Sequence, residues 1–351
     1  MFTSHAVPLR VMALITCAVC LIVVVLGAYV RLNDAGLGCP DWPGCYGHLS
    51  PLGAAADAGG NGGAAAIAQQ SGRPLELGKA WREMIHRYAA GTLVLLIVIL
   101  AGCAAAWRRE RLVPLALALT IPVLVIVQAL FGMLTVTLRL KPIIVTTHLL
   151  LGLTTLSLLW WLVLGLRKPG SPSRRFGLRE IDLPGPRLRA ARSLAAIGLV
   201  VLVLQIAMGG WTSSNYAALA CPDVPVCQGS LWPPADFQGG FNLARNLSLD
   251  DPRGFAQPAL VAIQLLHRLG AAVLSAALLA AVTAALRAHV RRGALAATLA
   301  VVAALALQLG IGITMVRDGF PLDIATAHNA GAALLLLATL ALNHALYPVD
   351  T

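Results

Sequence analysis

Long apolar runs separated by short polar segments dominate the chain. A helix that crosses a bilayer needs about 20 largely apolar residues, and eight runs reach that length. These runs cover residues 8–30, 85–107, 112–137, 143–166, 191–213, 258–286, 294–316 and 322–346. The pattern therefore predicts an all-α integral membrane protein with eight transmembrane helices.

The composition excludes a soluble enzyme. Of the 351 residues, 58% are hydrophobic and 12% are charged, whereas a soluble globular protein carries about 25% charged residues. The net charge of +11 does not indicate a nucleic-acid partner, because the basic residues form short clusters between apolar runs. Such clusters are typical of the cytoplasmic loops of a membrane protein.

The loop charges predict the orientation. Arginine and lysine are concentrated in the connections after the second, fourth and sixth runs, which places these loops and both termini in the cytoplasm. We therefore expect a multi-pass protein of the bacterial inner membrane, with the long loops 31–84 and 214–257 in the periplasm. Within the first of these loops, residues 53–72 are low-complexity and rich in Gly and Ala, and we expect them to be flexible.

An internal repeat relates the two halves of the chain at an offset of 180–182 residues. The matched positions are Gly27 with Gly209, Cys39 with Cys221, Cys45 with Cys227, His86 with His267, Gln128 with Gln308, Gly132 with Gly312 and His148 with His328. Each copy holds four apolar runs, so both copies insert with the same orientation. We expect two pseudo-symmetric four-helix bundles, residues 1–168 and 191–351, joined by a cytoplasmic Pro/Arg-rich linker at 169–190.

Four of the eight histidines lie at matched positions in the apolar runs, as the pairs His86/His148 and His267/His328. Each pair lies at one depth near the outer membrane boundary. One inward histidine on each of two helices is how a helical bundle holds a haem with two axial imidazoles. A single histidine could equally be a packing residue, but duplicated pairs favour iron ligands. A non-haem metal is less favoured, since no carboxylate or thiolate completes a ligand set around either pair.

Charged residues accompany these histidines. Arg87 and Arg268 directly follow a candidate ligand and could bind haem propionates, or they could anchor the helices at lipid headgroups. Glu83 shares a helix face with His86, whereas the repeat places Gln264 at that position in the second half. This asymmetry indicates chemistry at the first site, although a solvated boundary glutamate is the alternative.

Four of the seven cysteines form two Cys-x5-Cys pairs on the outer loops. An oxidising compartment favours the disulfides Cys39–Cys45 and Cys221–Cys227. A zinc or cluster site is the competing interpretation, but the spacing is not the Cys-x2-Cys of common zinc sites.

With the Glu83-x-x-His86 motif, the paired loop cysteines and the duplicated histidines, the chain resembles the haem A synthase (CtaA/COX15) family of membrane enzymes. The resemblance covers almost the whole chain. It implies successive hydroxylations that oxidise the C8 methyl of haem O to the formyl group of haem A, for cytochrome oxidase biogenesis. It also implies that His86 and His148 bind the substrate haem beside a catalytic Glu83. The resemblance assigns His267 and His328 as the axial ligands of a haem b cofactor.

The partners implied by the resemblance are haem O, a haem O synthase, cytochrome oxidase assembly proteins and a membrane electron donor. The sequence leaves a homo-oligomer open. Two other functions also stay open: a two-haem b-type membrane cytochrome that only passes electrons, and a haem transporter or chaperone that does not modify haem.

Overall fold

Eight long helices make up most of the protein. The computed structural model describes residues 5–58, 63–110, 112, 114–166, 185–243, 255–288, 290 and 292–347. The long helices are α1 (Ala6–Leu32), α4 (Leu77–Ala106), α5 (Leu115–Thr137), α6 (Pro142–Gly165), α7 (Pro186–Ser214), α10 (Gln257–Arg287), α11 (Arg292–Arg317) and α12 (Leu322–Ala345). All eight are long and apolar enough to cross a membrane, which confirms the eight predicted spans. The described residues contain no β-strand.

Proline marks the start of several helices. Pro142 and Pro186 begin α6 and α7, where the missing N–H of proline costs no helical hydrogen bond. Pro122 lies inside α5. A proline inside a transmembrane helix is tolerated because neighbouring helices satisfy the freed backbone groups.

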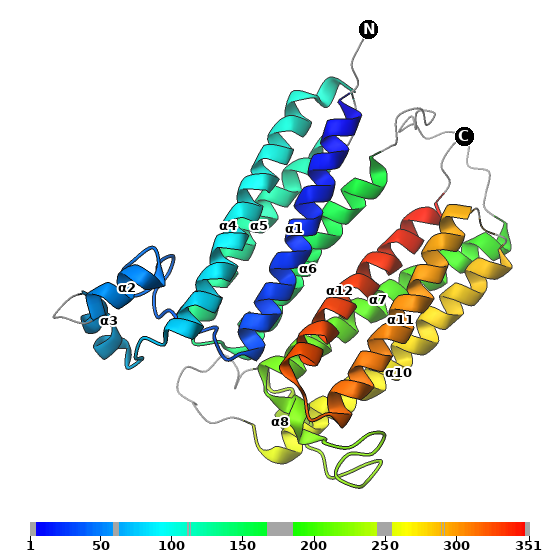
Figure 1. The fold of residues 1–351 in the computed structure, drawn as a ribbon. Coiled ribbons are helices and arrows are strands. Elements are labelled where there is room, and N and C mark those ends of the chain that lie inside the picture. The colour runs from blue at the N-terminus through cyan, green and yellow to red at the C-terminus, as the bar shows by residue number, and fades with distance from the viewer. Residues whose placement is uncertain are drawn as a thin grey trace.

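The long helices pack in two groups of four (Figure 1). In the first group, α1 and α5 each contact α4 and α6; in the second, α7 and α11 each contact α10 and α12. The groups meet where α12 contacts α1 and α6, and where α6 contacts α7. The pseudo-symmetry of the groups and the domain boundaries at 168 and 191 stay predictions. Most of the predicted linker at 169–190 lies outside the described residues, which resume at Gly185.

Shorter elements gather at one end of the long helices, which we call the loop end. They are α2 (Pro51–Ala58), α3 (Gly63–Ser71), η2 (Ala217–Ala220) and α8 (Phe237–Gly240). The start of α1 and the end of α12 both lie at the opposite end (Figure 1). The short helix η1 (Arg108–Glu110) lies beside the start of α1, where the N–H of His5 donates a hydrogen bond of 3.0 Å to Glu110. Helices α4, α6, α10 and α12 therefore begin at the loop end.

A continuous apolar core runs through both groups. Leu156, Leu159, Leu278 and Leu335 are among its fully buried side chains. Trp160 on α6 also donates a hydrogen bond of 3.0 Å to the carbonyl oxygen of Leu337 on α12. The groups thus share apolar packing and at least one polar contact, which holds their helices in a defined arrangement.

Candidate functional site

The structure brings together the two members of each predicted histidine pair. His86 on α4 and His148 on α6 lie within electrostatic interaction range of each other, as do His267 on α10 and His328 on α12. Each histidine lies within the first three turns of its helix, counted from the loop end. Each helix group therefore holds one histidine pair at a similar depth.

A glycine on a neighbouring helix lies against each of the four imidazoles. The pairs, with the distance from an ideal glycine Cβ to the imidazole Cε1, are Gly27 with His86 (3.0 Å), Gly132 with His148 (3.2 Å), Gly209 with His267 (3.2 Å) and Gly312 with His328 (3.0 Å). A side chain at any of these positions would crowd the ring, since carbon atoms in contact usually lie about 3.5–4.0 Å apart. This close approach gives the repeated glycines a physical reason.

Three glutamine side chains lie within hydrogen-bond distance of three of the four histidines. Gln128 donates a hydrogen bond of 2.9 Å to the carbonyl oxygen of His148, and the amide nitrogen of Gln308 lies 3.2 Å from Nε2 of His328. These two glutamines are matched by the repeat. The amide of Gln128 thus orients the backbone of His148, and the amide of Gln308 orients the ring of His328.

The third glutamine was not predicted as a site residue. Gln205 on α7 donates a hydrogen bond of 2.9 Å to the carbonyl oxygen of His267, and its amide nitrogen lies 3.1 Å from Nδ1 of the same histidine. The matched position in the first half is Val23, so a search for repeated residues misses Gln205. Its polarity within an apolar run is the signal that could have found it.

The histidine pairs have the donor atoms that a haem iron needs. Nδ1 of His86 and Nδ1 of His148 are buried and have no hydrogen-bond partner among the described residues. Buried ring nitrogens without partners are costly unless a ligand or water engages them. The described residues contain no group of three or more His, Cys, Asp or Glu side chains that could hold a metal ion. Two imidazoles per site, with glycine beside each, therefore fit a haem iron better than a non-haem metal.

Glu83 is buried, with 4% of its surface exposed. One carboxylate oxygen accepts a hydrogen bond of 2.8 Å from the backbone N–H of Cys39, and the other pairs with Arg87. In the second half Gln264 is equally buried, and its side-chain oxygen has no partner among the described residues. The charge difference predicted from the repeat is thus accompanied by a difference in contacts.

Both candidate propionate-binding arginines contact the cysteine loops. Arg87 donates hydrogen bonds to the carbonyl oxygens of Asp41 at 2.9 Å and Pro43 at 3.2 Å. Arg268 donates to Cys221 and Val226, both at 2.8 Å. The sequence did not predict these contacts, which fix each loop to the helix that carries a histidine. Propionate binding by Arg87 and Arg268 stays a prediction.

The two predicted disulfides are confirmed. The bonds Cys39–Cys45 and Cys221–Cys227 are present, and all four cysteines are buried. The remaining cysteines, Cys17, Cys20 and Cys103, are free and lie in long helices.

The segment at 53–72 differs from the flexible loop that we expected. Its described residues form most of α2 and α3, because alanine is the strongest helix former. Asp57 accepts a hydrogen bond of 2.9 Å from the N–H of Ala64 and lies 3.2 Å from Nε2 of His48. The Ala64 N–H and His48 lower the pKa of this carboxyl group. Ala64 also packs with Tyr46 and Met84, so the two short helices cover the first cysteine loop.

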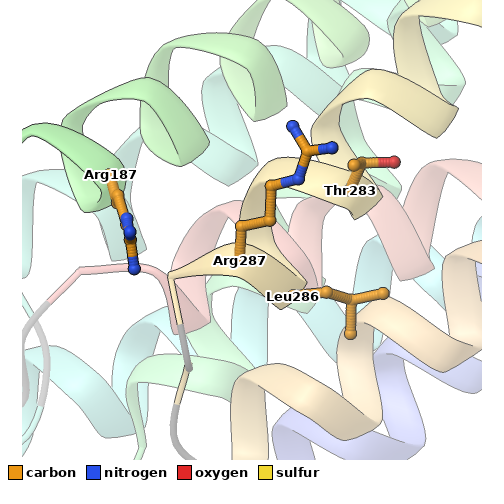
Figure 2. Close-up of a pocket in the computed structure, with 4 residues that line it drawn as sticks. All are labelled: Arg187, Thr283, Leu286 and Arg287. Carbon is orange, nitrogen blue, oxygen red and sulfur yellow. The ribbon is translucent and has the colours of Figure 1, made fainter.

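An open cleft lies at the other end of the protein, between the start of α7 and the end of α10 (Figure 2). Its volume is about 560 Å³, and its lining consists of Arg187, Thr283, Leu286 and Arg287. None of the predicted site residues lines it. The candidate site is therefore the set of histidine pairs near the loop end.

The fold and the site define a multi-pass membrane protein with two half-buried histidine pairs whose imidazoles could ligate a haem iron. Residues 10–340 match the COX15-CtaA family, described as cytochrome oxidase assembly protein. The chain belongs to this family.

The chain is similar to several bacterial proteins named Heme A synthase. The chain is 38% identical over 337 residues to Heme A synthase of Shewanella oneidensis, with 95% of each chain covered. It is 27% identical to Heme A synthase of Rhizorhabdus wittichii, with 92% of this chain and 90% of the relative covered. It is 28% identical to Heme A synthase of Nitrosospira multiformis, with 97% and 93% covered.

Proposed function

We propose that this protein is a haem A synthase, which oxidises the C8 methyl of haem O to the formyl group of haem A. The observation that carries the proposal is the 38% identity to a Heme A synthase over 95% of both chains. The paired histidines support it independently, since the substrate is itself a haem. The product serves cytochrome oxidase assembly, in agreement with the description of the family.

We assign the two histidine pairs to different haems. His86 and His148 hold the substrate haem O, whereas His267 and His328 hold a haem b cofactor. This assignment is supported in the first half by the buried, unpaired Nδ1 atoms of His86 and His148, and in both halves by the glycine beside each ring. Haem b supplies one-electron redox chemistry when bound. In the second half, Gln205 and Gln308 keep the imidazole rings oriented through their amide groups.

We assign Glu83 as the catalytic residue of the first half. Arg87 and the Cys39 N–H hold its carboxylate in place through hydrogen bonds, one helical turn before His86. A fixed negative charge at this position stabilises positive charge that develops when the methyl carbon is oxidised, or orients a water molecule. Gln264 has no charge, which restricts this chemistry to the first half.

The location and partners follow from the same evidence. Eight spanning helices make this a multi-pass membrane protein, and we place it in the bacterial inner membrane. Disulfides form in oxidising compartments, which supports periplasmic cysteine loops and cytoplasmic termini. A haem O synthase, cytochrome oxidase assembly proteins and a membrane electron donor are the partners that this function requires.

The proposal is tested by expressing the protein together with a haem O supply and analysing the extracted haems by mass spectrometry. Conversion of haem O to haem A is expected, and the H86A variant serves as the matched control without conversion. Recovery of haem O alone, with both histidine pairs loaded and an electron donor present, would overturn the proposal. That result would support the electron-carrying cytochrome or the haem transporter, which the named relatives do not favour.

A further inference from the structure

Arg31, near the loop end of α1, has a buried N–H without a hydrogen-bond partner among the described residues. Its Nη2 donates hydrogen bonds to the carbonyl oxygens of Ser213 at 3.0 Å and Ser214 at 3.4 Å. The guanidinium carbon also lies 4.3 Å from the centre of the Tyr216 ring. The Nε–H of the same group is buried and has no partner among the described residues. A buried N–H on a charged group is costly without an acceptor, so this atom points to a ligand.

The position of Arg31 relates it to the first histidine pair. Gly27 and Arg31 are four residues apart on α1 and therefore lie on the same side of that helix, about 6 Å apart along its axis. Gly27 lies against the imidazole of His86. Arg31 is thus one turn closer to the loop end than the point where α1 meets His86.

Arg31 has no counterpart in the second half. The repeat that matches Gly27 with Gly209 places Ser213 at the position of Arg31. Arg87 of the first half, in contrast, has a counterpart in the second half, Arg268. Both donate hydrogen bonds to carbonyl oxygens of the cysteine loops. Arg31 is therefore a guanidinium specific to the first half, and its buried Nε–H has no acceptor among the described residues.

We propose that the Nε–H of Arg31 binds a carboxylate of the porphyrin that His86 and His148 hold. This inference rests on the proposed function, because it requires a haem in the first half. Guanidinium groups form strong hydrogen bonds with carboxylates, and the propionates are the carboxylates of a haem. The propionate edge of the substrate then faces the loop end, close to the junction of α1 with α7.

The test compares two ligands that differ only in their carboxylates. The full-length H267A/H328A variant leaves the first histidine pair as the haem site. It is titrated with iron protoporphyrin IX and with its dimethyl ester, and binding is followed by absorbance. With Arg31 present, we expect haem to bind more tightly than the ester. Adding R31Q should reduce this preference by about 10-fold or more, as expected for loss of one charge-assisted hydrogen bond.

The ratio of the two affinities separates ligand contact from damage to the fold. Loss of the Ser213 and Ser214 contacts would weaken haem and ester equally and leave the ratio unchanged. The matched control is R192Q, because Arg192 also donates to a helix-end carbonyl, of Leu346, and lies over a tyrosine ring, but at the opposite end of the protein. R192Q should preserve the ratio.

Two results would overturn the inference, and they differ in what else they reject. An unchanged ratio in R31Q, with haem still bound, rejects the role of Arg31 and leaves the proposed function intact. Failure of the H267A/H328A protein to bind either ligand rejects the first-half haem site and therefore both proposals.

Discussion

Replacement of Glu83 by glutamine should loosen the first cysteine loop as well as slow the oxidation of haem O. The two carboxylate oxygens of Glu83 face two donors, the N–H of Cys39 at 2.8 Å and the guanidinium of Arg87. Glutamine has the same shape, but its NH₂ group cannot accept a hydrogen bond. In either orientation of the amide, one donor therefore meets another donor.

The structure sets the size of the expected effect. A hydrogen bond to a charged group contributes about 1.5–3 kcal/mol, so opening of the loop should become about 10- to 150-fold more favourable in E83Q. Hydrogen–deuterium exchange of a peptide that contains Cys39 measures this opening. Conversion of haem O should fall by about 10²–10³ if the charge acts on a transition state, and haem extraction followed by mass spectrometry measures it.

Two control variants separate the effect on the loop from the effect on catalysis. Asp41 accepts hydrogen bonds from the backbone N–H groups of Tyr46 at 2.6 Å and Gly47 at 2.8 Å, so D41N loosens the same loop and leaves Glu83 charged. Q264E introduces a carboxylate at the matched position of the second half and should not create a second catalytic site. Equal losses of conversion in D41N and E83Q, at equal loop exchange, would show that Glu83 acts only through the loop. Near-normal conversion in E83Q would leave Glu83 as a boundary glutamate.

Three further predictions concern the cofactor, the disulfides and pH. H267A or H328A should remove the part of the low-spin b-type absorbance that comes from the second half, and an unchanged spectrum would reject the haem b assignment. Thiol labelling of the unreduced, denatured protein should modify Cys17, Cys20 and Cys103, because the other four cysteines are in disulfides; modification of all seven would contradict both bonds. The lowered pKa of Asp57 means that its contribution to the α2–α3 pair is present above the unfolded-state pKa and is lost as the pH falls through the lower folded-state pKa. Hydrogen exchange of residues 51–71, corrected for its intrinsic pH dependence, should therefore rise in acid, and D57N should remove this response.

The sequence predicted the spans well where apolar residues continue to the end of the helix. The run at 143–166 corresponds to α6 at Pro142–Gly165. The start of α4 was less accurate, because the run was placed at 85–107 and the helix begins at Leu77. Its first turns contain Lys79, Arg82 and Glu83, so apolar content alone does not reveal them. Those turns carry the residue that we assign to catalysis.

The site was predictable in its repeated parts and not in its tertiary contacts. Histidines stand out within apolar runs, and an offset of 180–182 residues identifies their partners. The contacts of Arg87 with the cysteine loop depend on how a loop more than 40 residues away folds back. The burial of the Arg31 Nε–H depends on the meeting of two helices from different halves. Neither arrangement leaves a periodic signal in the sequence.

The differences between the halves favour a division of labour between the two histidine pairs. The first half has two charged residues, Glu83 and Arg31, at positions where the second half has Gln264 and Ser213. The second half has instead the neutral Gln205, which binds His267. A cofactor that stays bound needs fixed ligands, and a neutral amide holds an imidazole without adding charge to the site. A substrate must be recognised and oxidised, and fixed charges serve both needs because they bind carboxylates and stabilise charge that develops during reaction. The two halves thus share their histidines and glycines but differ in charge. This difference in charge is the physical reason to place the reaction in the first half.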